Sequence, residues 1–129
     1  MNQMAKLHNL YQKLIGAVRR AGSQKVDRST RIREHSYEEA CELAMQDYKR
    51  VLGKKIIVDE VDGYEGSDST TASGEIIAKV LKTNRSDICR QVDEFIDPYW
   101  DVKVISGPPA AMKLRSTWVY GPSYKIKNR

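Results

Sequence analysis

Two stretches in the N-terminal half of the chain carry apolar side chains at the spacing of an amphipathic helix. In the first, seven apolar residues recur every three or four positions within residues 3–21, and Gly22 follows as a helix stop. The second begins at Ser36, because Ser36 and Glu39 fit a capping box that satisfies free backbone N–H groups of the first turn. The pattern therefore predicts one helix over residues 3–21 and another from Ser36 to just before Gly53.

Residues 75–96 contain two further apolar groups, separated by five polar residues from Lys82 to Ser86. The first group lies within residues 75–81 and the second within residues 86–96, each at helical spacing. Asp97-Pro98 ends the second group, because proline and the residue before it disfavour further helix. The pattern predicts two helices joined by a polar turn.

Three short strands are also predicted. An apolar run at residues 54–58 and alternating positions at residues 100–105 and 112–120 are typical of strands, and turn residues at 106–109 separate the last two. The acidic stretch at residues 59–75 is interpreted as a solvated loop.

This order of elements resembles the winged helix-turn-helix family over residues 36–121. The local match lies in AKVLKTNRSDICRQV, where Ala78 takes the place of the small residue that lets the two helices approach. The apolar residues that match the family's anchors are Leu81, Ile88 and Val92. Lys82 departs from the pattern, which often has glycine at this turn position. The resemblance implies an α+β fold, a winged helix-turn-helix domain with an additional N-terminal amphipathic helix.

The chain divides on this basis into three parts. Residues 1–35 form the N-terminal amphipathic helix and a basic connector, residues 36–121 form the winged helix-turn-helix domain, and residues 122–129 form a basic tail. The connector, residues 22–35, is expected to be a solvated loop or an arm laid on phosphates. The apolar face at residues 4–18 would either join two chains as a homodimer or pack on its own domain.

The resemblance implies that helix 86–96 reads the major groove of double-stranded DNA. Arginine can pair with guanine and glutamine with adenine, while basic residues of the wing contact the DNA backbone or the minor groove. The residues expected to bind DNA are Arg85, Ser86, Asp87, Arg90, Gln91, Lys103, Lys113 and Arg115. Trp118 and Tyr120 are expected to pack beneath the wing rather than to stack on bases. The implied function is that of a small, sequence-specific transcriptional regulator.

The net charge of +5 is unevenly distributed along the chain. Residues 1–35 carry eight Lys and Arg against two acidic residues, and residues 102–129 carry six against none. Residues 36–101 carry eight basic and fifteen acidic residues. Two basic ends flanking an acidic middle favour a polyanionic partner that both ends contact.

The few cysteines and histidines are Cys41, Cys89, His8 and His35, and they are widely scattered. This spacing predicts no metal site and no cofactor, and both cysteines are expected to be reduced thiols. Gly63 does not mark a calcium loop, because its flanking positions lack the required acids. Since no apolar run reaches membrane-spanning length, we expect a cytoplasmic protein without membrane contact.

Two alternative functions stay open. Winged domains also bind proteins, so an adaptor or inhibitor with no DNA binding, using the acidic stretch as its contact, is one alternative. A small metal-dependent nuclease is the other, because Asp101 and Lys103 alternate on a predicted strand and Asp59 and Asp62 lie near another. We find no nucleophile–base pair and no phosphate-binding glycine loop, and therefore expect no catalytic residues and no enzyme activity.

Overall fold

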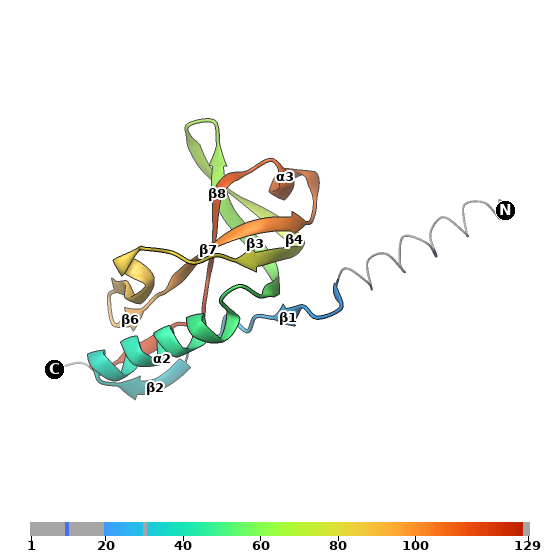
Figure 1. Ribbon diagram of the computed structural model, residues 1–129. Helices are drawn as coiled ribbons and strands as arrows, with labels where there is room; N and C mark the ends of the chain where they lie inside the picture. The colour runs from blue at the N-terminus through green and yellow to red at the C-terminus, as the bar shows by residue number, and fades with distance from the viewer. Residues whose placement is uncertain (1–9, 11–19, 30, 128–129) are drawn as a thin grey trace.

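A small antiparallel barrel and a second sheet share one long helix (Figure 1). The structure, a computed structural model, describes Leu10 and residues 20–29 and 31–127. The barrel consists of β3 (Lys55–Glu65), β4 (Asp68–Val80), β7 (Tyr99–Ser106) and β8 (Arg115–Tyr120), with β1 (Gln24–Lys25) beside β3. The second sheet consists of β2 (Arg31–His35), β9 (Tyr124–Ile126), β6 (Phe95–Ile96) and β5 (Gln91–Val92). The helices are α2 (Tyr37–Val51), α3 (Pro109–Met112) and the 3-10 helix η1 (Ser86–Cys89).

The barrel closes because β8 returns to pair with β3. Antiparallel pairing runs from β3 to β4, to β7, to β8, and then back to the end of β3. The closing strands approach each other at Gly63, where an added Cβ would lie 2.9 Å from Cγ2 of Thr117 and 3.0 Å from the carbonyl oxygen of Arg115. No larger side chain fits there without movement of the backbone, so Gly63 determines where the barrel closes.

Inward-facing apolar side chains fill the barrel. The most deeply buried of them include Ile56, Val61, Ile76, Val80, Trp100 and Val119. The Trp100 side chain is 1% exposed, and Gly121 lies against its ring, where an added Cβ would be 2.5 Å from Cζ2. Burying each large side chain contributes about 1.5–3 kcal/mol, so this core is the main source of the barrel's stability.

The helix α2 packs on both sheets. Tyr48 and Val51 near its end join the barrel core, whereas Ala40 and Ala44 pack with the second sheet. In that sheet β2 pairs in parallel with β9, and β9 pairs with the β5–β6 hairpin through β6. Since β2 and β9 come from the predicted connector and the predicted tail, segments far apart in sequence lie side by side beneath α2 (Figure 1).

The helix predicted from Ser36 is confirmed as α2. The Ser36 hydroxyl oxygen accepts a hydrogen bond of 3.2 Å from the backbone N–H of Glu39, and Lys49 and Arg50 occupy the last turn, where the helix dipole favours positive charge. The predicted strands at residues 54–58 and 100–105 are confirmed within β3 and β7. These three elements carry their determinants within a few neighbouring residues.

The predicted winged helix-turn-helix fold is wrong, because neither helix of the predicted pair is present. Residues 75–80 belong to β4 and pair with β3 and β7. Ile76, Ile77 and Ala78 are buried in succession, and the pairing with β7 shifts register between Ile77 and Ala78. A strand buried on both faces shows a continuous apolar run, which helical spacing also fits.

Residues 86–96 form η1 and a hairpin instead of one helix. After η1, strands β5 and β6 pair across a two-residue turn at Asp93 and Glu94. Asp93 has a φ of 53°, as tight hairpin turns require, and its carbonyl oxygen accepts a 3.0 Å hydrogen bond from Nε2 of Gln91. The predicted reading helix is therefore absent.

Polar and charged stretches predicted as loops also contribute strands. β3 and β4 pair through the acidic stretch, from Glu60 with Ser73 to Glu65 with Asp68, around Gly66 at a φ of 65°. The connector contains β1 and β2, and the tail contains β9. The predicted third strand begins only at Arg115, because residues 109–112 form α3. Outward-facing strand positions tolerate polar side chains, so polarity did not prevent pairing.

The predicted helix at residues 3–21 and dimer surface at residues 4–18 lie, apart from Leu10, Arg20 and Ala21, outside the described residues, and both stay predictions. Within the described residues, no helix is long and apolar enough to span a membrane.

Candidate functional site

Four aromatic side chains form a row on the outer face of the barrel. We name this row the aromatic stripe, and its members in order are Tyr64, Trp118, Tyr99 and Tyr120. The successive ring centroids are 5.6, 6.4 and 6.0 Å apart. Strand register explains the row, because Tyr99 pairs with Tyr120, and cross-strand partners share one face of a sheet. Tyr64 is 40% exposed and the other three rings are only half-buried, so ring surface stays open to solvent.

Arg85 lies over the ring of Tyr99 in the stripe. Its Cζ is 5.0 Å from the ring centroid, and its Nε is 3.3 Å from Oδ2 of Asp101. The Tyr99 hydroxyl donates to the carboxylate of Asp87, and this hydrogen bond, together with burial, raises the pKa of Tyr99. Tyr99 therefore keeps its proton at neutral pH and is held at its hydroxyl by Asp87 and at its face by Arg85.

Arg28 repeats this arrangement at the end of the stripe. Its Cζ is 5.6 Å from the centroid of the Tyr120 ring, and its Nη1 is 3.1 Å from Oε1 of Glu60. In both arrangements a carboxylate orients a guanidinium that covers part of a phenol ring. The stripe thus has two rings under oriented arginines, Tyr99 and Tyr120, and beside them two rings, Trp118 and Tyr64, with no arginine placed over them among the described residues.

Residues 81–90, which we name the strap, connect β4 to β5 and carry Arg85. Tyr48 of α2 holds the start of the strap, since its hydroxyl donates to the Leu81 carbonyl oxygen and accepts from the Thr83 N–H, both at 3.0 Å. Ile88, 4% exposed, anchors the second half in the barrel core. The position of Arg85 therefore depends on contacts with α2 and the core.

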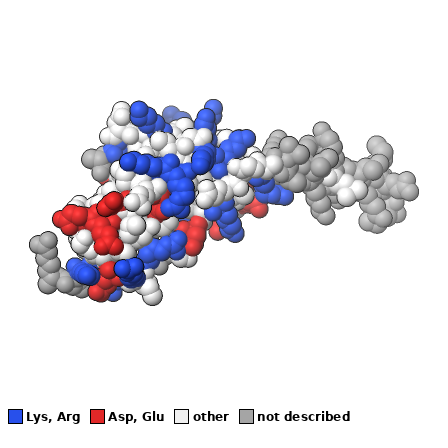
Figure 2. Space-filling model, turned by 60° about the horizontal axis from the view of Figure 1, so that its bottom comes forward, with Lys and Arg blue, Asp and Glu red and all other residues white. Residues whose placement is uncertain are grey.

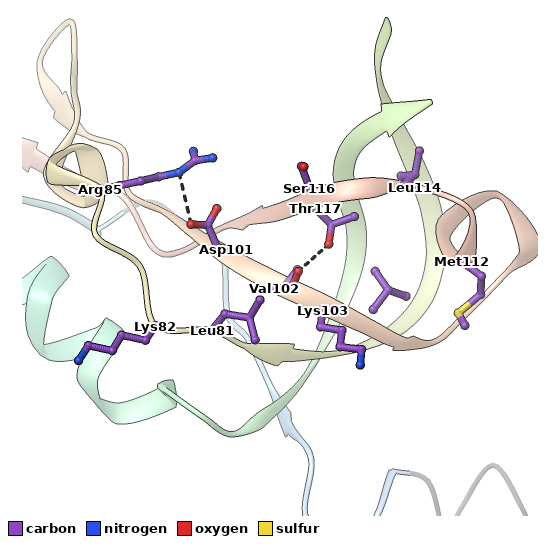
Figure 3. A pocket seen from close by; sticks show the side chains of 11 residues that line it. Leu81, Lys82, Arg85, Asp101, Val102, Lys103, Met112, Leu114, Ser116 and Thr117 are labelled. Atoms are coloured by element: carbon purple, nitrogen blue, oxygen red, sulfur yellow. Dashed lines mark hydrogen bonds and ion pairs between the residues drawn. The ribbon is translucent and has the colours of Figure 1, made fainter. Parts of the chain in front are cut away.

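A groove of about 620 Å³ adjoins the stripe between the strap and strands β7 and β8 (Figure 3). Arg85 and Asp101 lie at one end of it and Met112 at the other. The residues that line it are Leu81, Lys82, Arg85, Asp101, Val102, Lys103, Val104, Met112, Leu114, Ser116 and Thr117. The Thr117 hydroxyl donates to the Val102 carbonyl oxygen at 2.6 Å and so ties the two strands together. Because Arg85 belongs to both surfaces, groove and stripe are continuous.

The groove carries an excess of positive charge. Lys82 and Lys103 are exposed, and neither forms an ion pair with another residue in the described part of the chain. Arg85 and Asp101 compensate each other. Figure 2 shows Lys and Arg side chains across the middle and upper part of one face, with Asp and Glu side chains gathered toward its left. The groove therefore suits an anionic ligand.

Three residues predicted to bind DNA meet at this surface: Arg85, Asp87 and Lys103. The structure places Lys113 and Arg115 near the β3–β4 turn. Lys113 Nζ is 3.0 Å from Oε1 of Glu65, and Arg115 Nη2 donates to the Gly66 carbonyl oxygen at 2.8 Å.

The other predicted residues do not join the groove. Arg90 is exposed between η1 and β5, and Gln91 belongs to the hairpin. Ser86 begins η1, and its side chain lies outside what the structure describes. Since these residues share no helix, they do not form a reading surface together with Arg85.

The acidic residues of the nuclease hypothesis are not brought together. Asp101 on β7 and Asp62 on β3 both pair with Trp118, from opposite sides of β8. Two strand spacings separate them by roughly 10 Å. Asp62 accepts a hydrogen bond from Thr71, and Asp101 pairs with Arg85. Among the residues described, no group of three or more His, Cys, Asp or Glu is placed to hold a metal ion.

Sequence reasoning missed Tyr64, Tyr99 and Arg28. Tyr99 could have been found, because Tyr99, Asp101 and Lys103 alternate with buried residues of β7. Tyr64 lies in the acidic stretch, and no local signal predicts its position beside Trp118. Trp118 and Tyr120, expected to pack beneath a wing, lie half-buried on the outer face of the barrel.

A second group of aromatic and charged side chains lies between α2 and the second sheet. The hydroxyl of Tyr124 donates to Asp47, which also accepts from Arg50. His35 packs edge-on to the Tyr124 ring at 5.8 Å, and its Nδ1 is 2.7 Å from Oε1 of Glu39. Burial, followed by the hydrogen bond to Asp47, raises the pKa of Tyr124 to about 12. We name these five residues the buried cluster after the buried Tyr124, Asp47 and His35 at its centre. The side chains of Arg50 and Glu39 reach this centre from the surface.

Comparison with known proteins assigns no family to the chain. No protein-family model matches it, and no similar protein is found among curated sequences or solved structures. The candidate site is therefore defined by the contacts within this chain.

Proposed function

We propose that this protein binds single-stranded nucleic acid along the aromatic stripe and the adjoining groove. The observation that carries the proposal is the row of four part-exposed rings, two of which lie under an oriented arginine. Proteins that bind single strands combine aromatic platforms for the bases with a positively charged groove for the backbone. Both parts adjoin here and share Arg85.

The tilt of the rings favours a single strand over a duplex. Neighbouring rings of the stripe are inclined to one another by 54° to 63°, so they do not form one flat surface onto which parallel, stacked bases could extend. Bases of a single strand can separate and stack individually on such rings, whereas duplex bases are already stacked on each other. The rings therefore suit bases that have been splayed apart.

Lys82 and Lys103 are the groove residues best suited to contact phosphates. Both are exposed and have no ion-pair partner in the described part of the chain. The nearby carboxylates of Asp101 and Glu60 are each compensated by an arginine that lies on the stripe. Repulsion of a polyanion by these carboxylates is correspondingly reduced.

The resemblance implied sequence-specific binding of double-stranded DNA through a helix at residues 86–96. These residues form η1 and a hairpin instead, so the helix expected to enter the major groove is absent. A duplex of matched sequence is therefore the comparison ligand rather than the proposed one. Binding of a duplex with higher affinity than its single strand would overturn the preference proposed here.

The proposal is tested by fluorescence anisotropy with a labelled oligothymidylate and with the matched duplex, at low and physiological salt. We expect salt-sensitive binding of the single strand and a large loss of affinity on Trp118→Ala and on Arg85→Ala. Lys49→Ala, which removes an exposed positive charge from α2, is the control and should leave affinity nearly unchanged.

Absence of binding at low salt would contradict the proposal. So would an affinity that Lys49→Ala lowers as much as Arg85→Ala does, because binding would then reflect net charge alone. Circular dichroism of each variant shows whether the barrel is intact.

The protein-interaction alternative has one observation in its favour. Leu81 and Met112 line the groove and are 38% and 50% exposed, so a peptide with apolar and acidic side chains would also fit between them and the lysines. If nucleic acid does not bind, this groove is the surface to test by substituting Met112→Glu in a pull-down from native extract.

A further inference from the structure

The two cysteines lie in contact, although they are 48 residues apart. Cys41 belongs to α2, and Cys89 is the last residue of η1 in the strap. The Cys89 thiol donates to the Cys41 carbonyl oxygen with an Sγ–O distance of 3.4 Å. Both residues are half-buried, and neither is in a disulfide.

We propose that Cys41 and Cys89 form an intramolecular disulfide under oxidising conditions, and that this bond fixes the strap to α2. The proposal concerns a modification site and is independent of the proposed nucleic-acid binding. In the reduced protein the strap is held to α2 by hydrogen bonds and packing, which open and close far more readily than a covalent bond.

The environments of the two thiols determine the order of the reaction. Burial, followed by the proximity of Cys41, raises the pKa of Cys89 to about 11, so few Cys89 thiolates form at neutral pH. Cys41 is next to Tyr37, which is 44% exposed and is hydrogen-bonded to the Cys41 thiol. We therefore assign the first reaction to Cys41 and the second, resolving, reaction to Cys89.

With glutathione disulfide as the oxidant, the exchange balances in two steps. The Cys41 thiolate attacks one glutathione sulfur, forms a mixed disulfide and releases one glutathione thiolate. The Cys89 thiolate then attacks the Cys41 sulfur, breaks the mixed disulfide and releases the second glutathione. The two protons of the cysteine thiols pass to the released glutathiones, and the two electrons reduce the oxidant.

The strap has a weak point that this bond would reinforce. Oδ1 of Asp87 is buried and has no hydrogen-bond partner among the described residues, whereas the other carboxylate oxygen accepts from Tyr99. An unsatisfied buried oxygen destabilises the closed position of η1. Linking the adjacent Cys89 to α2 opposes local opening at this point.

Intact-protein mass spectrometry tests whether the bond forms. The full chain is incubated with excess oxidised glutathione at mildly alkaline pH and then treated with iodoacetamide under denaturing conditions. We expect a product about 2 Da lighter than the reduced chain that takes up no iodoacetamide. Peptide mapping should join the peptides that contain residues 41 and 89.

Cys41→Ser and Cys89→Ser are the matched variants. Cys41→Ser should react slowly with glutathione, and Cys89→Ser should stop at the mixed disulfide. A wild-type product that carries glutathione on both cysteines, a disulfide-linked dimer, or two thiols that stay free would each overturn the proposal. These outcomes are read from the wild-type chain, so misfolding of a variant does not obscure them.

Hydrogen exchange tests whether the bond fixes the strap. We expect the amides of residues 86–90 to exchange at least tenfold more slowly after oxidation, while those of the β3–β4 turn around Gly66 keep their rates. Equal exchange of residues 86–90 in the two forms would overturn the proposed effect on the strap, even if the disulfide forms.

Discussion

The aromatic stripe and the buried cluster use the same kinds of side chain in opposite ways. In the buried cluster, the Tyr124 hydroxyl, Asp47 and Arg50 satisfy one another, and the ring packs against His35. On the stripe, Arg85 also joins a carboxylate and a tyrosine, but the neighbouring rings are partly open to solvent. The first arrangement stabilises the fold, and the second leaves surface for a ligand.

The difference shows that residue type alone does not identify a binding site. Tyr124 and Asp47 form a structural network where the sheet and helix cover them, because their polar groups must then be satisfied within the protein. The tyrosines on the uncovered face of the barrel keep ring surface available beside their arginines. Coverage by a neighbouring element therefore distinguishes the two regions.

The largest expected effect is on stability, from the buried cluster. Tyr124→Ala should lower the free energy of unfolding by about 3–5 kcal/mol, because it empties a buried aromatic position. Tyr124→Phe should lower it by about 1–3 kcal/mol, because Asp47 loses a hydrogen-bond donor. Urea denaturation measures both changes. Folded Tyr124→Phe should bind oligothymidylate as the wild type does; a large loss of affinity would break the comparison between the two regions.

Substitutions on the stripe should lower the affinity for a single strand more than they lower the stability of the fold. Trp118→Ala is expected to weaken binding of a single strand by about 1–3 kcal/mol, roughly 5- to 150-fold in Kd, because one base loses its stacking partner. Trp118→Phe keeps an aromatic face and should recover most of the affinity. Anisotropy titration measures the change, and urea denaturation should show a smaller stability loss than for Tyr124→Ala. Equal affinity of Trp118→Ala and wild type would show that no base stacks on Trp118.

The groove lysines should affect salt dependence more than specificity. Replacing Lys82 and Lys103 together by alanine should reduce the slope of log K against log salt by about 0.7 for each lost phosphate contact. Lys49→Ala/Lys127→Ala removes the same charge from α2 and the region after β9, and should leave the slope nearly unchanged. Equal slopes for the two double variants would show that Lys82 and Lys103 do not contact the phosphates of the bound strand.

The smallest expected effect is a loss of folding stability at alkaline pH, caused by ionisation of Tyr124. The pKa of Tyr124 is raised from 10.0 to about 12 in the folded state, so the folded protein keeps a proton that the unfolded chain loses. This contribution to stability is present below pH 10 and is lost as pH rises toward 12. Denaturation midpoints of wild type and Tyr124→Phe should therefore converge over this range. A constant difference between them would contradict the raised pKa.

The extent to which the sequence predicts this fold varies between elements. The start of α2 was predictable, because Ser36 and Glu39 are close in the chain and cap the helix whatever lies around it. Residues 75–80 were predicted as helix, yet their β-branched Ile76, Ile77 and Val80 favour strand once β3 and β7 offer pairing edges. Local spacing could not distinguish these outcomes.

The candidate site was predicted only in part. Arg85, Asp87 and Lys103 were singled out, but for a helical reading surface that does not form. The contact of Tyr64 with Trp118 depends on barrel closure at Gly63, which joins segments more than fifty residues apart. The sequence around Tyr64 and the sequence around Trp118 contain no pattern that predicts this closure of the barrel.

The sequence by itself determined the elements whose causes are local: the cap and apolar face of α2, the strand cores at residues 54–58 and 100–105, and the uneven charge. The tertiary structure decided the pairing of β4, the hairpin within residues 86–96, and the row of rings on the barrel. The physical reason is that helix capping acts between near neighbours. A strand instead obtains its hydrogen bonds, its buried face and its exposed face from partners that only the folded chain brings alongside it.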